Sequence, residues 1–360
     1  MVRLGVGRAA RLTLVAALAV GCMNGCVSGH DTAPGDEEAA VDVPHASSSR
    51  VFVPAATDVA TTQGVTFGGV VTNILTGEPV ADAIVTIGDV SAITDGDGAY
   101  SLQVLASQEL GFTAEAAGYY TRESAVSITG STTINPEIIP QGDGFSLAFF
   151  DHVFRYGQQG TRRWLNQPEV EIWSQQLACI EPCGSAGYEV TTDAVPEHFE
   201  TYAREAIAHM SDLSGGGMEE PVITMKSQEV GSHVSSYESS ENIRFKYLKT
   251  FAPPYDTDGG ATSGHATSDN AWVDAPISIN GSASPSAYSN AIYVHEFAHA
   301  MGWIPGHPQG VSAVPEPSIM GPNPVVVTDA DRLHGRVLYG RPPGSQSPDR
   351  DPPGFHINGE

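Results

Sequence analysis

Basic residues are scarce in this chain of 360 residues. Its 17 lysines and arginines stand against 42 aspartates and glutamates, which gives a net charge of −25 at pH 7. Nucleic acids and anionic membrane surfaces repel a protein this acidic, so we expect neither to be a binding partner. A simple need for solubility explains the excess of carboxylates equally well.

Cysteines are also few. The chain has four, and none of them form the Cys-x-x-Cys pair that is typical of a thiolate zinc site. Cys179 and Cys183 lie in the short segment Cys-Ile-Glu-Pro-Cys, which a disulfide can close in an oxidising compartment. We therefore predict a disulfide between Cys179 and Cys183 in an exported protein.

The N-terminal apolar run, Leu12 to Val20, is too short to span a bilayer as a stable helix. Three arginines precede it, so residues 1–21 are predicted to be a signal peptide. The sequence Ala19-Val20-Gly21-Cys22 resembles a bacterial lipobox. The resemblance implies a lipid on Cys22 and anchoring in the cell envelope, at the outer membrane or cell surface. Secretion without a lipid is the alternative.

Composition divides the rest of the chain. Residues 22–62 show no apolar periodicity and are predicted to be a disordered tether. Residues 63–140 contain short alternating runs separated by turns, such as Ala83 to Ile87 and the tight turn at Thr94 to Gly98. This pattern predicts a small antiparallel β-sandwich.

The same segment resembles the carboxypeptidase regulatory-like domain, a transthyretin-like sandwich. The matching pieces include Gly77-Glu78-Pro79-Val80, Thr94 to Tyr100 and Ala117-Gly118-Tyr119. The resemblance implies a non-catalytic module for spacing or weak binding. Asp95 and Asp97 could bind calcium, but a hairpin turn explains them as well.

Residues 145–341 predict a mixed α+β domain, and residues 342–360 a disordered tail. The expected strands are Phe145–Phe150, Val170–Trp173, Pro221–Met225, Ile243–Tyr247 and Trp272–Ile279. The expected helices are Val195–Ser214, Ser284–Ala300 and Asp329–Gly340.

His295, Glu296 and His299 carry the chemistry of this domain. Residues four apart share one face of a helix, so the two imidazoles can bind one zinc ion. Glu296 follows the first ligand, where its carboxylate can act as the general base on a zinc-activated water. Two surface histidines on an amphipathic helix are the alternative explanation of this short pattern.

The residues after the helix strengthen the prediction of a zinc site. Gly302 tolerates the left-handed backbone needed to end the helix. His307 follows it as the expected third ligand, with His334 as a more distant second candidate. Met320, in Ser318-Ile319-Met320, could lie beneath the site.

These residues resemble the metzincins, whose pattern is His-Glu-x-x-His-x-x-Gly-x-x-His followed by a Met-turn. His295, Glu296, His299 and Gly302 match directly, and Met320 matches the Met-turn methionine. Pro305 occupies the usual position of the third ligand, and His307 lies two residues later.

The resemblance extends to the matrixin branch, whose closing helix is similar to Asp329–Gly340. It implies that Trp272–Ile279 is the edge strand that pairs with substrate. Matrixins also carry a structural zinc or calcium site before this strand. The residues available here for such a second metal are Asp256, Asp258, His265 and Asp269. A polar, glycine-rich loop is the alternative explanation of these four residues.

The function predicted from the sequence is that of a monomeric zinc metalloendopeptidase acting on a protein or peptide substrate. A membrane would be involved only through the N-terminal lipid. The alternative is a surface binding or adhesion protein whose zinc domain is structural or inactive. The intact Glu296 favours the enzyme, because a purely structural zinc site does not need this carboxylate.

Overall fold

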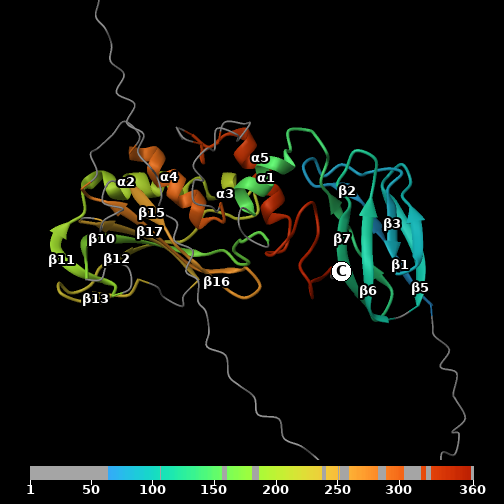
Figure 1. Cartoon of the computed structure of the whole chain (residues 1–360), viewed down its shortest axis with the longest axis horizontal. Helices are drawn as coiled ribbons and strands as arrows, with labels where there is room; N and C mark the ends of the chain where they lie inside the picture. Colours follow the sequence, from blue (N-terminus) through green and yellow to red (C-terminus); the bar gives the residue numbers. More distant parts are fainter. Residues whose placement is uncertain are drawn as a thin grey trace, which may run out of the picture.

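The computed structural model describes residues 64–105, 107–155, 160–180, 186–236, 241–249, 251, 259–282, 289–303, 318–321 and 326–357. These residues form a β-sandwich followed by a second part in which helices lie over a large sheet, as Figure 1 shows. No helix in these ranges is both long enough and apolar enough to cross a membrane.

The β-sandwich occupies the segment predicted for it. Its strands are β1 (Gly64–Val70), β2 (Thr72–Asn73), β3 (Ile84–Ile87), β4 (Val90–Ile93), β5 (Ala99–Leu105), β6 (Ser107–Glu115), β7 (Arg122–Ile128), β8 (Thr132–Thr133) and β9 (Glu137–Ile138). They form sheets in the orders β5-β1-β8, β7-β6-β3-β4 and β2-β9. Alternate residues of β5 are buried, as expected for a strand with one face on the core.

The tight turn predicted at Thr94 to Gly98 joins β4 to β5. The Asp95 carboxylate accepts hydrogen bonds from the backbone N–H groups of Asp97 and Ala99, at 3.0 and 2.9 Å. Gly98 has a φ of +72°, which favours glycine. Asp95 therefore serves the turn itself.

The second part is built on an eight-stranded mixed sheet. Its strands are β10 (Glu169–Cys179), β11 (Tyr188–Ala194), β12 (Ile223–Lys226), β13 (His233–Val234), β14 (Asn242–Leu248), β15 (Gly260–Thr262), β16 (His265–Ala266) and β17 (Trp272–Asn280). The order along the sheet is β13-β11-β10-β14-β17-β15, with β12 beside β10 and β16 beside β17. The strands predicted at 170–173, 221–225, 243–247 and 272–279 all belong to this sheet.

The expectation that Trp272–Ile279 is an edge strand is wrong. This strand, β17, lies between β14, to which it is parallel, and β15, to which it is antiparallel. The edge is formed by β15, a three-residue strand. β15 contains two small residues and one threonine, so its composition gave no strand signal.

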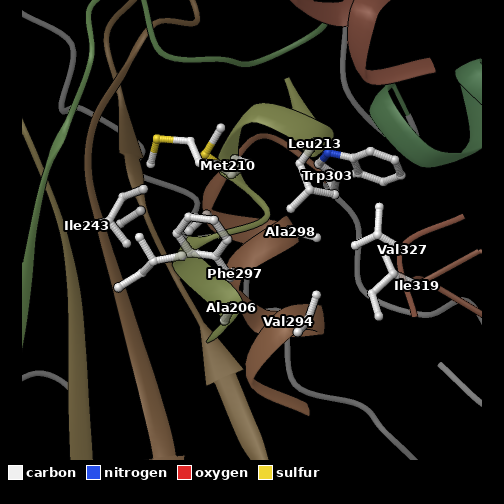
Figure 2. Close-up of a cluster of buried hydrophobic side chains, with 14 of the residues drawn as sticks. Ala206, Met210, Leu213, Ile243, Val294, Phe297, Ala298, Trp303, Ile319 and Val327 are labelled. Carbon is white, nitrogen blue, oxygen red and sulfur yellow. The ribbon is translucent and has the colours of Figure 1, made fainter. Parts of the chain in front are cut away.

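The helices are α1 (Leu147–Phe154), α2 (Glu197–Ile207), α3 (Met210–Leu213), α4 (Ser289–Ala300) and α5 (Asp329–Tyr339). The expected helix at 195–214 consists of α2 and α3, and the one expected at 284–300 begins at Ser289 within the described residues. Figure 2 shows how α4 enters the core through Val294, Phe297 and Ala298, with Ile243 of the sheet close by.

The strand expected at Phe145–Phe150 is wrong, because this segment begins helix α1. The Ser146 side chain caps the helix by accepting a hydrogen bond from the backbone N–H of Phe149 at 3.3 Å. Phe149, Phe150, Val153 and Phe154 are all buried. This spacing suits one face of a helix, whereas a short apolar run by itself does not distinguish a helix from a strand.

The disordered tail expected at 342–360 is also wrong, because residues 341–357 are ordered. We call them the C-terminal strap. The strap ends in β18 (His356–Ile357), which pairs with β7 in parallel and so adds a strand to the sandwich. It also contacts the second part of the chain, where Gly344 donates a backbone hydrogen bond to the Thr161 carbonyl at 2.6 Å.

Two buried ion pairs fix the strap. The Arg341 guanidinium donates two hydrogen bonds to the Asp349 carboxylate, at 2.6 and 2.8 Å, and both side chains are fully buried. Arg122 of β7 donates to Asp351 at 3.1 Å. Both arginines also donate to the backbone carbonyl of Glu137 in the sandwich. A sequence pattern could not reveal this, because the partners in the sandwich lie more than 200 residues from the strap.

We predict that replacing Asp349 with alanine strongly destabilises the protein. The change leaves Arg341 buried without its carboxylate, and breaking a buried pair in this way costs about 3–5 kcal/mol. The measurement is the free energy of unfolding in urea. Glu123→Gln is the matched control, because it removes the exposed pair with Arg350, which contributes about 1 kcal/mol or less. Equal unfolding midpoints for the two variants would contradict the prediction.

Candidate metal centre

Helix α4 carries His295, Glu296 and His299, and it contacts α2, β15 and β17. The three side chains are buried, with exposed fractions of 4%, 7% and 8%. The alternative of two surface histidines is therefore wrong. Imidazole and carboxylate groups are seldom buried without a strong interaction, which makes this part of the helix a candidate site.

The two histidines meet as their spacing predicts. Their ring centroids are 4.9 Å apart, and the ring planes are nearly perpendicular, at 88°. Both side chains leave the same face of α4 one turn apart. They can therefore approach one ion from two directions.

Backbone carbonyls determine the tautomer of each histidine. His295 Nδ1 lies 2.8 Å from the carbonyl oxygen of Ile319, and His299 Nδ1 lies 2.5 Å from that of Trp303. A carbonyl oxygen only accepts, so each Nδ1 must carry the proton. In the neutral rings the lone pair is then on Nε2. This arrangement is common among zinc-binding histidines, because the second hydrogen bond fixes the ring orientation and increases the basicity of the ligand.

The turn that follows α4 supplies the Trp303 carbonyl. Gly302 has a φ of +104°, and a Cβ at this position would lie 2.2 Å from the backbone oxygen of Arg162. The chain can therefore turn here only with glycine, as predicted. The turn brings the Trp303 carbonyl back to His299, while the Trp303 ring packs edge-on against Phe154 at 4.7 Å.

The other carbonyl comes from the turn at residues 318–321, which contains Met320. Met320 is buried and directly follows Ile319, whose carbonyl accepts the hydrogen bond from His295. The predicted Met-turn methionine thus lies on the segment that orients one of the two histidines. Figure 2 shows Ile319 beside Val327 at the edge of the apolar core.

Asp331, which the sequence analysis did not single out, holds this turn in place. Its carboxylate is fully buried and accepts hydrogen bonds from Ser318 Oγ at 2.6 Å and from the Ile319 backbone N–H at 3.0 Å. It also accepts one from the Thr328 backbone N–H at 2.8 Å, completing a capping box at the start of α5. The sequence signal for the cap was Thr-x-x-Asp before an apolar run. That signal does not reveal the link to the turn.

Glu296 is held by the sheet edge. Its Oε2 accepts a hydrogen bond from the hydroxyl of Thr262, with 2.8 Å between the oxygens. The Glu296 backbone carbonyl lies 2.9 Å from the same hydroxyl. Thr262 belongs to β15, whose importance the sequence analysis also missed.

His334, the second candidate for the third ligand, is excluded by its position in the core. Its Nδ1 donates to the Ala330 carbonyl at 2.7 Å, and its Nε2 accepts from the Ser146 backbone N–H at 3.0 Å. The ring also stacks on Phe145 at 5.0 Å. Both nitrogens are therefore committed to joining α5 to the start of α1.

Several of the other predicted site residues lie outside the described ranges. His307, Cys22 and Cys183 lie outside them, as do Asp256 and Asp258 of the proposed second metal site. His265, in β16, and Asp269, which follows that strand, are both exposed. Cys179, in β10, is disulfide-bonded, and its pairing with Cys183 stays a prediction. Within the described residues, no group of three or more His, Cys, Asp or Glu side chains is arranged to hold a metal ion.

No family model and no curated protein matches the chain. Solved structures that align with part of it include a C-terminal interface mutant of the type II cohesin–X–dockerin complex from Acetivibrio cellulolyticus, with 23% identity over 21% of this chain and a TM-score of 0.18. A DUF3823 family protein from Parabacteroides merdae shows 17% identity over 21% of this chain, with a TM-score of 0.19.

A third structure, chlorocatechol 1,2-dioxygenase from Pseudomonas putida, has 10% identity over 23% of this chain and a TM-score of 0.18. The aligned parts are 57%, 46% and 61% of the three structures, so the chain spans about half the length of each. Nothing about function follows from likeness at this level. The function must be inferred from the site itself.

Proposed function

We propose that the protein is a zinc-dependent endopeptidase of the metzincin type. The observation that carries the proposal is the pair of buried histidines on one face of α4, each with its Nδ1 proton committed to a backbone carbonyl. In each neutral ring the lone pair is then on Nε2, the nitrogen that would bind the metal. The adjacent buried carboxylate of Glu296 supplies the group needed for hydrolysis.

The proposed ligands are His295, His299 and His307, leaving one position of a tetrahedral site open. A bound zinc ion would lower the pKa of its water and polarise the peptide carbonyl. Glu296 would take the proton from the water and return it to the leaving amine. Its placement one residue after His295 keeps it close to this chemistry.

The proposed location is the bacterial cell envelope. The lipid would be attached to Cys22, and residues 22–62 would be the tether, while secretion without a lipid is the alternative. The sandwich is bound to the second part of the chain through the C-terminal strap. We therefore propose that it supports the catalytic part instead of moving independently of it.

The test is casein or gelatin hydrolysis by the purified protein, with its metal content measured in parallel. Zinc should be bound at about one ion per chain, because the proposed three-histidine set makes one site. A zinc chelator such as phenanthroline should abolish hydrolysis, and added zinc should restore it. Bound zinc without any hydrolysis would favour the binding or adhesion protein. Hydrolysis that survives complete removal of the metal would contradict the proposal.

A further inference from the structure

The hydroxyl of Thr262 makes a contact that the proposed chemistry does not by itself require. It can donate to the Glu296 carboxylate or to the Glu296 backbone carbonyl, which lie 2.8 and 2.9 Å away. An ionised carboxylate is the stronger acceptor. The contact therefore restrains the side chain that the proposed function uses as its base.

The edge strand is shaped to bring this hydroxyl close to α4. Gly260 and Thr262 are two residues apart on β15, so they face the same side of the sheet. A Cβ on Gly260 would lie 2.8 Å from Glu296 Cγ and 3.3 Å from its Cδ. The missing side chain thus allows the strand to lie along the Glu296 side chain, and Thr262 reaches the end of it.

Such a restraint matters because a carboxylate is itself a good zinc ligand. Glu296 directly follows His295 in α4, so its side chain starts from a Cα adjacent to that of a proposed zinc ligand. A carboxylate that coordinated the ion would fill the open position and would stop acting as a base. The site therefore needs a group that keeps Glu296 near the ion without letting it bind.

We propose that Thr262 is this positioning residue, holding the Glu296 carboxylate against the edge strand so that it acts as a base and not as a ligand. The inference rests on the proposed zinc-dependent function. It adds that the sheet edge controls the position of the base. It also predicts that loss of the hydroxyl changes turnover and metal retention in opposite directions.

The experiment compares Thr262→Val and Thr262→Ser in the full-length, zinc-loaded protein. Valine keeps the shape and removes the hydroxyl, so kcat should fall about tenfold, the scale of one hydrogen bond to a charged group. KM should change little. Zinc should pass to a competing chelator roughly several times more slowly, because the released Glu296 carboxylate would add one ligand to the ion. Serine keeps the hydroxyl and should restore both values.

Further variants separate positioning from damage to the fold. Ser263→Ala changes the exposed neighbour of Thr262 and should behave like the wild type. Combining Thr262→Val with Glu296→Gln should return zinc release to the rate of Glu296→Gln alone, because glutamine is a poor zinc ligand. If the valine variant does not fold, Thr262→Ala replaces it, because it also lacks the hydroxyl.

Two results would overturn the inference while leaving the proposed function intact. One is a valine variant that matches the wild type in both kcat and zinc release. The other is a variant that loses zinc and activity together, as a structural defect would cause. A wild-type protein that binds no zinc would overturn the inference and the proposed function together.

Discussion

Glu296→Gln is expected to lower the rate of peptide hydrolysis by about 100-fold or more while zinc stays near one ion per chain. Glutamine keeps the size of the side chain but cannot take the proton from water, and a general base contributes on this scale. The buried contact with Thr262 can be kept, because the amide oxygen also accepts a hydrogen bond. The measurements are metal content and the kcat of the two proteins.

His307→Ala is the companion variant, with the opposite expected pattern. Two imidazoles hold zinc weakly, so zinc affinity and activity should fall together. If this variant keeps its full zinc and activity, the third ligand lies elsewhere in the chain. An active Glu296→Gln protein would instead contradict the proposed mechanism.

Asp331→Ala is expected to have the second largest effect. It removes the only carboxylate that joins the start of α5 to the turn at residues 318–321 within the described residues. Several buried donors then lose their acceptor, and each such loss costs about 1–3 kcal/mol. The Ile319 carbonyl should no longer hold His295 in place. Zinc affinity should therefore fall about tenfold, the lower end of the range for lost outer-shell contacts.

The free energy of unfolding and the zinc affinity are measured separately, both at a temperature where the variant is folded. Asp329→Asn is the matched control. It lies in the same first turn of α5, but its side chain is fully exposed and pairs with Arg332. Stability and zinc affinity close to those of the wild type are expected for it. An Asp331→Ala protein that loses stability but keeps its zinc affinity would show that the turn does not orient His295.

Local patterns in the sequence identified the elements that depend on neighbouring residues. The spacing of His295 and His299 placed both on one helical face, and Gly302 correctly marked the end of that helix. Alternation located the strand at Ala83 to Ile87, and the turn residues located the tight turn before β5. These predictions succeed because helix periodicity, strand alternation and a positive φ are properties of a few consecutive residues.

Only the tertiary structure decided which distant residues support the site. Thr262 and Asp331 contact it across 34 and 12 residues of chain, through hydrogen bonds that leave no periodic trace in the sequence. The same holds for His334, whose ring nitrogens are used by α5 and by Ser146. The burial of α1 and of the strap likewise depends on partners far along the chain. A sequence pattern therefore places the two histidines on their helix, while the folded chain determines how their protons and the Glu296 carboxylate are held.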